Sequence, residues 1–208
     1  MADKITSWKY TEDAILEDDV LRNARARAEE LGVECITPSV GATLSMLVNS
    51  LQARSIVEVG SGTGVSAIYL LRGSNTAVLA TIDNEQEHTN ATKSTLADEG
   101  IAANRLRIIT GKATEVLANL ADAAYDLVLL DADRETLDLQ LGEASRMLRP
   151  GGVIAIAHAL WRDRVPDPAM RDEATQIYRD LIRQLLNNDE FATSLLPIGD
   201  GLLLASKR

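Results

Sequence analysis

The sequence predicts an α/β protein with a doubly wound, mostly parallel sheet of seven strands, an antiparallel C-terminal hairpin and helices ahead of the sheet. From residue 55 onward, short apolar runs alternate with helical stretches, which is typical of an open sheet flanked by helices. The runs are almost continuously apolar, as parallel strands are when helices cover both faces. Near the C-terminus, Gly199-Asp200-Gly201 joins two apolar runs, and so short a connection indicates a hairpin.

The individual elements follow from local patterns of apolar residues. An amphipathic helix is predicted over residues 12–31, ending at Gly32, because apolar side chains recur there at three- to four-residue spacing. Thr37-Pro38 predicts the start of the next helix, since proline is favoured at the first helical position. Further helices are expected at 64–72, 85–99, 112–120, 135–148 and 169–187, and strands at 55–59, 77–82, 105–110, 126–130, 152–157, 191–197 and 202–206.

Length and composition limit the kind of protein this is. The 208 residues suit one domain, in which we expect an N-terminal helical cap at 1–51 and an α/β core at 52–208. A formal net charge of -10 would repel nucleic acid, and no apolar run approaches the roughly 20 residues that a membrane span needs. The N-terminus lacks the pattern of a secretory signal and Cys35 has no partner for a disulfide, so we expect a cytoplasmic protein.

A glycine-rich turn follows the first predicted strand and opens the next helix. Its glycines, Gly60, Gly62 and Gly64, have G-x-G-x-G spacing, whereas a turn that binds a dinucleotide pyrophosphate has G-x-G-x-x-G. A zwitterionic cofactor without phosphate therefore fits better, with Glu58 available for its ammonium group. Asp83 ends the second strand, where a carboxylate can accept hydrogen bonds from ribose hydroxyls. The alternatives are an NAD site, or a plain tight turn with Asp83 as a helix cap.

Further short motifs occur in a defined order along the chain. With them the sequence resembles the caffeoyl-CoA and catechol O-methyltransferases, which depend on S-adenosylmethionine, from about Ile36 to the C-terminus. The resemblance implies a class I methyltransferase fold, and the protein is similar to a divergent bacterial-type member. The motifs are Ile36-Thr37-Pro38, the run from Val57 to Ser66, Thr81-Ile82-Asp83, Gly111-Lys112-Ala113, the run from Tyr125 to Asp133 that ends in Asp131-Ala132-Asp133, Gly151-Gly152-Val153-Ile154, Leu160-Trp161 and the run from Leu196 to Gly201.

The resemblance implies a binding role for each matching position. One group of residues would hold the methionine end of the cofactor, a second group its ribose and adenine, and Asp131 would also face the methyl acceptor. Family members are commonly homodimers, so a homodimer is expected here. The implied cofactor-binding residues are Ile36, Glu58, Gly60, Ser61, Gly62, Ser66, Asp83, Asn84, Ala113, Asp131 and Asp133.

The acceptor side departs from the family pattern. The catecholic members hold a divalent cation with the first Asp of Asp-Ala-Asp and with an Asp-Asn pair after the fifth strand; here Asp131 is kept, but Ala157 and His158 replace the pair. One carboxylate and one imidazole make a poor site for Mg²⁺ or Ca²⁺, which prefer several oxygen ligands. The family's lysine, a proposed base, is Arg134, which stays protonated and instead suits an acidic group on the acceptor.

These departures change the expected chemistry. His158 and Asp131 are the predicted catalytic residues, with His158 as the base that takes the acceptor proton, or else as a strand-end residue bound to a carbonyl. Asp131, Arg134 and Trp161 are predicted to contact the acceptor, although Trp161 could instead bury its ring under the 162–168 loop. The predicted function is O-methylation of a small hydroxylated, phenol-like molecule without the family's metal. The alternatives are a cofactor-binding regulatory protein, a homologue that has lost catalysis, and an NAD(P) oxidoreductase.

Overall fold

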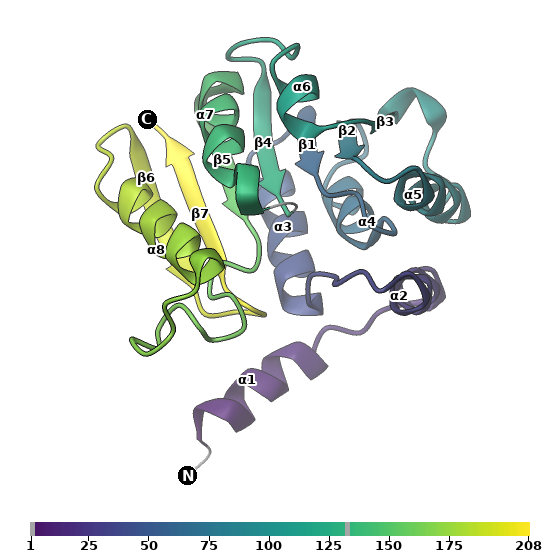
Figure 1. Ribbon diagram of the computed structural model, residues 1–208. Helices are drawn as coiled ribbons and strands as arrows, with labels where there is room; N and C mark the ends of the chain where they lie inside the picture. Colours follow the sequence, from purple (N-terminus) through teal and green to yellow (C-terminus); the bar gives the residue numbers. More distant parts are fainter. Residues whose placement is uncertain (1–2, 132–133) are drawn as a thin grey trace.

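A computed structural model describes residues 3–131 and 134–208. These residues form a seven-stranded sheet in the order β3-β2-β1-β4-β5-β7-β6 (Figure 1). Neighbouring strands among β1 to β5 pair in parallel, and β7 runs antiparallel to both β5 and β6. The predicted fold class is therefore confirmed. The strands are β1 (Ser55–Val59), β2 (Val78–Asp83), β3 (Leu106–Thr110), β4 (Tyr125–Leu130), β5 (Leu148–Ile156), β6 (Phe191–Leu196) and β7 (Leu202–Lys207).

Helices cover both faces of the sheet and create two separate cores. Alternate strand residues point to opposite faces, so Ile56 packs in one core and Val57 in the other. Helices α2 to α5 contribute to the first core, and helices α6 to α8 adjoin the second. The helices are α1 (Lys4–Asp13), α2 (Asp19–Leu31), α3 (Pro38–Ser50), α4 (Val65–Arg72), α5 (Gln86–Asp98), α6 (Ala113–Leu117), α7 (Leu137–Met147) and α8 (Glu173–Leu186), with 3-10 turns η1 (Ala103–Arg105) and η2 (Arg134–Thr136).

The N-terminal helix prediction was wrong in one respect. Residues 12–31 do not form a single helix, because α1 ends at Asp13 and α2 begins at Asp19. The Asp18 carboxylate accepts a hydrogen bond from the Leu21 N–H and so caps a new helix. Leu16, one of the apolar residues within the predicted helix, lies between α1 and α2 and is 91% exposed.

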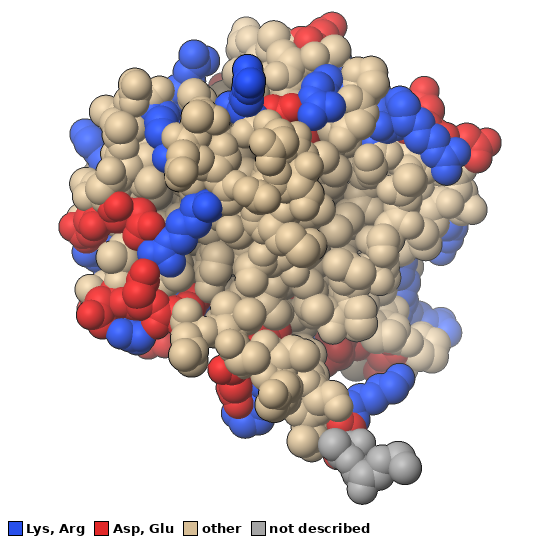
Figure 2. Space-filling view, turned by 180° about the vertical axis from the view of Figure 1, so that it is seen from behind, with Lys and Arg blue, Asp and Glu red and all other residues tan. Residues whose placement is uncertain are grey.

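The surface carries mixed charges around an uncharged area. Figure 2, seen from behind, shows the area at the centre of that face, with Lys, Arg, Asp and Glu around its margin. The area lies over α3, the helix behind the sheet in Figure 1, which has no charged residue along its length. Within the described ranges, each helix is too short or too polar to cross a bilayer.

Candidate active site

A cavity of about 610 Å³ opens at the carboxyl ends of β1, β2 and β4. Strand β1 lies between β2 and β4, so the order of the strands reverses at this point of the sheet. Open α/β sheets bind their ligands at the carboxyl ends of the strands where the order reverses. Eight of the predicted cofactor residues line the cavity together: Ile36, Gly60, Gly62, Ser66, Asp83, Asn84, Ala113 and Asp131. Asp133 lies outside the described residues.

The glycine loop takes a backbone shape that other residues adopt at a cost. Gly60, Gly62 and Gly64 have φ angles of 95°, 50° and 88°, in the region that favours glycine. The Gly62 N–H donates to Asp83 Oδ2 at 3.0 Å, so the carboxylate at the end of β2 holds the loop at the end of β1. Asp83 therefore lies where it can position the loop and also face a ligand in the cavity.

His88 is a cavity residue to which the sequence gave no role. It lies in the first turns of α5, and its Nδ1 is 3.1 Å from Asp83 Oδ1. The same carboxylate oxygen accepts the Glu85 N–H at 3.0 Å. The sequence did hold one signal for this contact, because His88 comes five residues after Asp83. At that spacing, a side chain in the first turn of the helix can point back toward the end of the preceding strand.

Two of the predicted cofactor residues, Glu58 and Ser61, are buried and are not among the residues that line the cavity. Glu58 is fully buried on β1, where the Thr81 hydroxyl donates to its Oε2, and the Ser61 hydroxyl lies 2.7 Å from Thr81 Oγ1. Burial raises the pKa of Glu58 to about 7, although hydrogen bonds from Ser66 and Thr81 oppose the rise. Among the described residues, Glu58 Oε1 has no hydrogen-bond partner, so a donor from a bound ligand would satisfy it.

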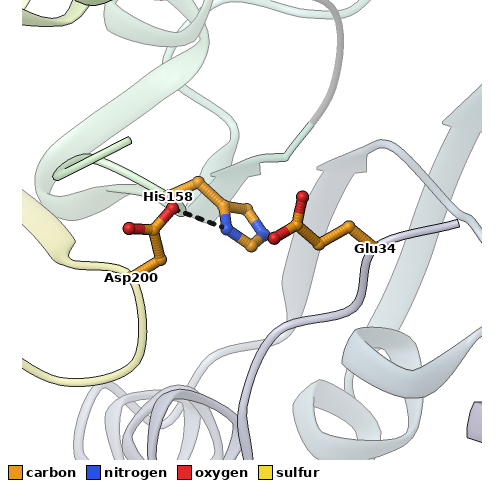
Figure 3. Close-up of side chains that lie close together, drawn as sticks. All are labelled: Glu34, His158 and Asp200. Carbon is orange, nitrogen blue, oxygen red and sulfur yellow. Dashed lines mark ion pairs between the residues drawn. The ribbon is translucent and has the colours of Figure 1, made fainter. Parts of the chain in front are cut away.

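His158 follows β5 and lies among carboxylates from other parts of the chain. Its Nε2 is 3.4 Å from Asp131 Oδ1 at the end of β4, and its Nδ1 is 3.4 Å from Asp200 Oδ2 in the β6–β7 turn. Glu34, from the α2–α3 loop, is the third: ligand-type atoms of Glu34, His158 and Asp200 all lie within 4.8 Å of one another. Figure 3 shows Glu34 and Asp200 approaching the imidazole from opposite sides.

The carboxylates determine the charge of His158. Burial alone would lower its pKa, but Asp200, Asp131 and Glu34 outweigh burial and raise the pKa to about 9. Burial also raises the pKa of Asp131, against the lowering effect of the positive charge on His158. At neutral pH the imidazole is therefore a cation, and its neutral form, which a base requires, is a minor species.

The backbone after β5 is held in an unusual conformation by the β6–β7 turn. His158 has a φ of 54°, a left-handed value that few non-glycine residues adopt. The Ala159 and Leu160 N–H groups donate to the carbonyls of Gly201 and Asp200. A side chain at Gly201 would meet Leu160 Cγ at 2.5 Å, so glycine is needed where the turn packs on this segment. The C-terminal hairpin thus places Asp200 beside His158.

The sequence did not identify Glu34 or Asp200 as part of this site. Asp200 was recognised only as a turn residue, and Glu34 lies in a loop without a motif. Arg162 contacts both acids: its guanidinium pairs with Glu34 at 2.6 Å, and its backbone N–H donates to Asp200 Oδ1 at 2.6 Å. Only the fold brings these distant parts of the chain together.

Trp161 carries cations on its ring next to the His158 cluster. Tyr178 of α8 stacks on the indole with ring centroids 5.4 Å apart. The guanidinium carbons of Arg134 and Arg162 lie 4.6 and 5.4 Å from the Trp161 ring centroid. Arg134 and Trp161 thus lie together, as expected of two predicted acceptor contacts, but the contact with an acceptor stays a prediction.

Comparisons with known proteins identify the family. A family model described as O-methyltransferase matches residues 6–208. The chain belongs to this O-methyltransferase family. A Mycobacterium ulcerans protein named "Putative O-methyltransferase" is 43% identical over 197 residues, which cover 94% of this chain and 88% of that protein. The resemblance drawn from the sequence motifs is therefore confirmed, and the chain is an O-methyltransferase.

Solved structures of other proteins share the fold of this O-methyltransferase. A protein of Corynebacterium glutamicum is 26% identical with a TM-score of 0.88, covering 95% of this chain and 94% of its own. The O-methyltransferase TomG of Streptomyces achromogenes, solved in complex with SAM, is 24% identical with a TM-score of 0.86, covering 99% of each chain. At that level of identity the second comparison supports the fold alone.

Proposed function

We propose that the cavity binds S-adenosylmethionine and that the enzyme transfers its methyl group to a hydroxyl of a small, phenol-like acceptor. The observation that carries the proposal is the set of eight predicted cofactor residues that line one cavity beside the His158 cluster. The cofactor supplies an electrophilic methyl group on a sulfonium centre when bound. The protein supplies a fixed position for it, with Asp83 for the ribose and the unpartnered Glu58 Oε1 for the ammonium group.

The acceptor would reach the cavity beside Asp131, which both lines the cavity and lies 3.4 Å from His158. We infer that Asp131 would take the proton of the acceptor hydroxyl; the bound cofactor would supply the methyl group to the acceptor oxygen and would keep the electron pair of the C–S bond on its sulfur. The raised pKa of Asp131 makes it a stronger base than an ordinary carboxylate. His158, as a cation, would orient and balance Asp131 rather than act as the base first predicted.

A planar acceptor with an acidic group fits the surroundings of this position. Arg134 lies on the Trp161 ring, and none of the described carboxylates forms an ion pair with its guanidinium. Guanidinium groups bind carboxylates and phosphates through paired hydrogen bonds. An acceptor that carries such a group next to a phenol would match both Arg134 and the indole of Trp161.

The donor set supports a reaction without the family's hard divalent cation. Ala157 has no donor atom and is 3% exposed, and the imidazole of His158 lies against Asp131 where oxygen ligands would be required. Glu34 and Asp200 approach the imidazole from opposite sides (Figure 3). One ligand-type atom of each of Glu34, His158 and Asp200 lies within 4.8 Å of the others, but Glu34 already pairs with the Arg162 guanidinium at 2.6 Å. We therefore derive no step through a metal.

Chelation tests this proposal. Activity toward phenols that carry a carboxylate should stay within about twofold of its starting value after dialysis against EDTA, because a protein cation already neutralises Asp131. Readdition of Mg²⁺ is the control and should change nothing. Loss of activity that Mg²⁺ restores would contradict the metal-free reaction. Tight cofactor binding without turnover across such a panel would favour the alternative of a homologue that has lost catalysis.

His158→Gln tests the role of the imidazolium. The pKa of His158 is raised, so the charged form is complete well below pH 9 and is lost as the pH rises through about 9. The wild-type kcat should fall across that range, while the variant should be about 100-fold slower at pH 7.5 and lack this fall. Affinity for S-adenosylhomocysteine should change less than threefold. A wild-type kcat that instead rises through pH 9 would identify neutral His158 as the base.

We also propose a cytoplasmic homodimer. The uncharged face over α3, with Met46 60% exposed, suits contact with a second copy better than contact with water in a protein of net charge -10. Sedimentation equilibrium should give twice the chain mass, and Met46→Lys should shift it toward the monomer. A wild-type mass of one chain at micromolar concentration would reject the dimer.

A further inference from the structure

Helix α1 is attached to the protein mainly through one side chain. From Lys4 to Asp13, every residue of the helix is exposed except Glu12. Even the large apolar side chains Ile5, Trp8 and Tyr10 are 76%, 44% and 75% exposed. Apolar burial therefore contributes little to the position of α1, and the contacts of Glu12 must account for most of it.

The Glu12 carboxylate accepts four hydrogen bonds from two other segments. Its Oε1 accepts from the Thr37 hydroxyl at 3.1 Å, the Ser39 hydroxyl at 2.5 Å and the Gly199 N–H at 3.2 Å, and its Oε2 accepts from the Ser39 N–H at 3.0 Å. Bonds of this kind to a charged acceptor are among the stronger ones in proteins. One carboxylate thus joins α1, the start of α3 and the β6–β7 turn.

At α3, Glu12 acts as a helix cap that comes from another helix. Thr37 stands at the N-cap position of α3, but its side chain makes no capping hydrogen bond to the helix. The backbone N–H of Ser39, in the first turn, donates to Glu12 instead. The negative charge of Glu12 also interacts favourably with the positive end of the helix dipole. The residues just before the cap, Val33 to Ile36, line the cofactor cavity, so the cap sets the position of one cavity wall.

At the β6–β7 turn, Glu12 holds the residue next to Asp200. A side chain on Gly199 would meet Thr37 Oγ1 at 2.7 Å, so the turn lies directly against the start of α3. Asp200 pairs with His158 at 3.4 Å and accepts the Arg162 N–H. The Gly199 N–H bond to Glu12 therefore lies one residue from a partner of the proposed catalytic cluster.

We propose that Glu12 is a positioning residue that couples the docking of α1 to the cofactor cavity and to the His158 cluster. It touches no reacting atom and acts through Ile36 on one side and Asp200 on the other. The inference rests on the proposed function only in assigning the cavity to S-adenosylmethionine and its product. Because coupling between two equilibria is reciprocal, cofactor binding should in turn stabilise the docked α1.

Glu12→Gln tests the coupling, with Asp13→Asn as its matched control. The amide keeps the size of the side chain but replaces one acceptor oxygen with a donor, which faces N–H and O–H donors. Asp13 is the next residue of α1, and its carboxylate pairs only with the exposed Lys9 among the described residues, at 3.3 Å. The two variants lose the same charge from the same helix, and only Glu12→Gln replaces an oxygen that accepts hydrogen bonds from the start of α3 and the β6–β7 turn.

Two readouts are expected to separate the variants. In Glu12→Gln, amide hydrogen exchange at Ser39 and Gly199 should accelerate, and the Kd of S-adenosylhomocysteine should rise about three- to tenfold. In Asp13→Asn both should match the wild type. Saturating S-adenosylhomocysteine should slow exchange in α1 of the wild type. In Glu12→Gln the ligand should no longer slow exchange in α1, whereas exchange in β1 and β4 should be the same as in the wild type.

The result that would overturn the inference is a Glu12→Gln protein that binds S-adenosylhomocysteine as Asp13→Asn does. A wild type whose α1 exchange is unaffected by the bound ligand would overturn it as well. If Glu12→Gln is unfolded at the assay temperature, Ser39→Ala removes one donor and should give a smaller change of the same sign; no change there would also reject the coupling. Failure of the proposed function differs from all of these, since the wild type would then not bind the ligand.

Discussion

A buried positive charge requires negative partners, and three segments of the chain meet at His158 to supply them. Asp131 comes from the end of β4, Asp200 from the β6–β7 turn and Glu34 from the α2–α3 loop. The largely buried carboxylates of Asp131 and Asp200 would be costly at this place without the imidazolium, and the imidazolium without its acidic partners would lose its proton. The left-handed backbone at His158 and the packing of Gly201 on Leu160 are the structural cost of bringing these groups together.

The two halves of the site follow different physical rules. The half that we propose for the cofactor is built from backbone: a glycine loop with left-handed φ angles, fixed by Asp83 at the point where the strand order reverses. The acceptor half is built from charged side chains on loops, with Asp131 as the residue common to both halves. We infer that this division lets the chemistry of the acceptor half change without a change in the backbone of the glycine loop.

The sequence predicted those parts that depend on local pattern. Apolar runs, the glycine spacing and the Gly199-Asp200-Gly201 turn were enough for the sheet, the glycine loop and the hairpin. It failed where the deciding contacts join distant segments: Glu34 and Glu12 lie in no motif, Asp200 was recognised only as a turn residue, and only the fold brings the three to the site. It also assigned His158 a neutral ring, because the carboxylates that raise its pKa are not adjacent in the chain. The prediction of a single helix over residues 12–31 was wrong because it rested on apolar spacing alone, whereas the Asp18 side chain caps a new helix.

We propose that a protein cation, rather than a divalent metal, lies beside Asp131. The most direct measurement is a crystal structure with S-adenosylhomocysteine grown in millimolar Mn²⁺, with anomalous diffraction recorded at the manganese edge. We expect S-adenosylhomocysteine in the cavity against Asp83, the His158 ring within ion-pair distance of Asp131, and no anomalous peak between them. A manganese peak coordinated by Asp131, with the His158 ring displaced from it, would contradict the claim.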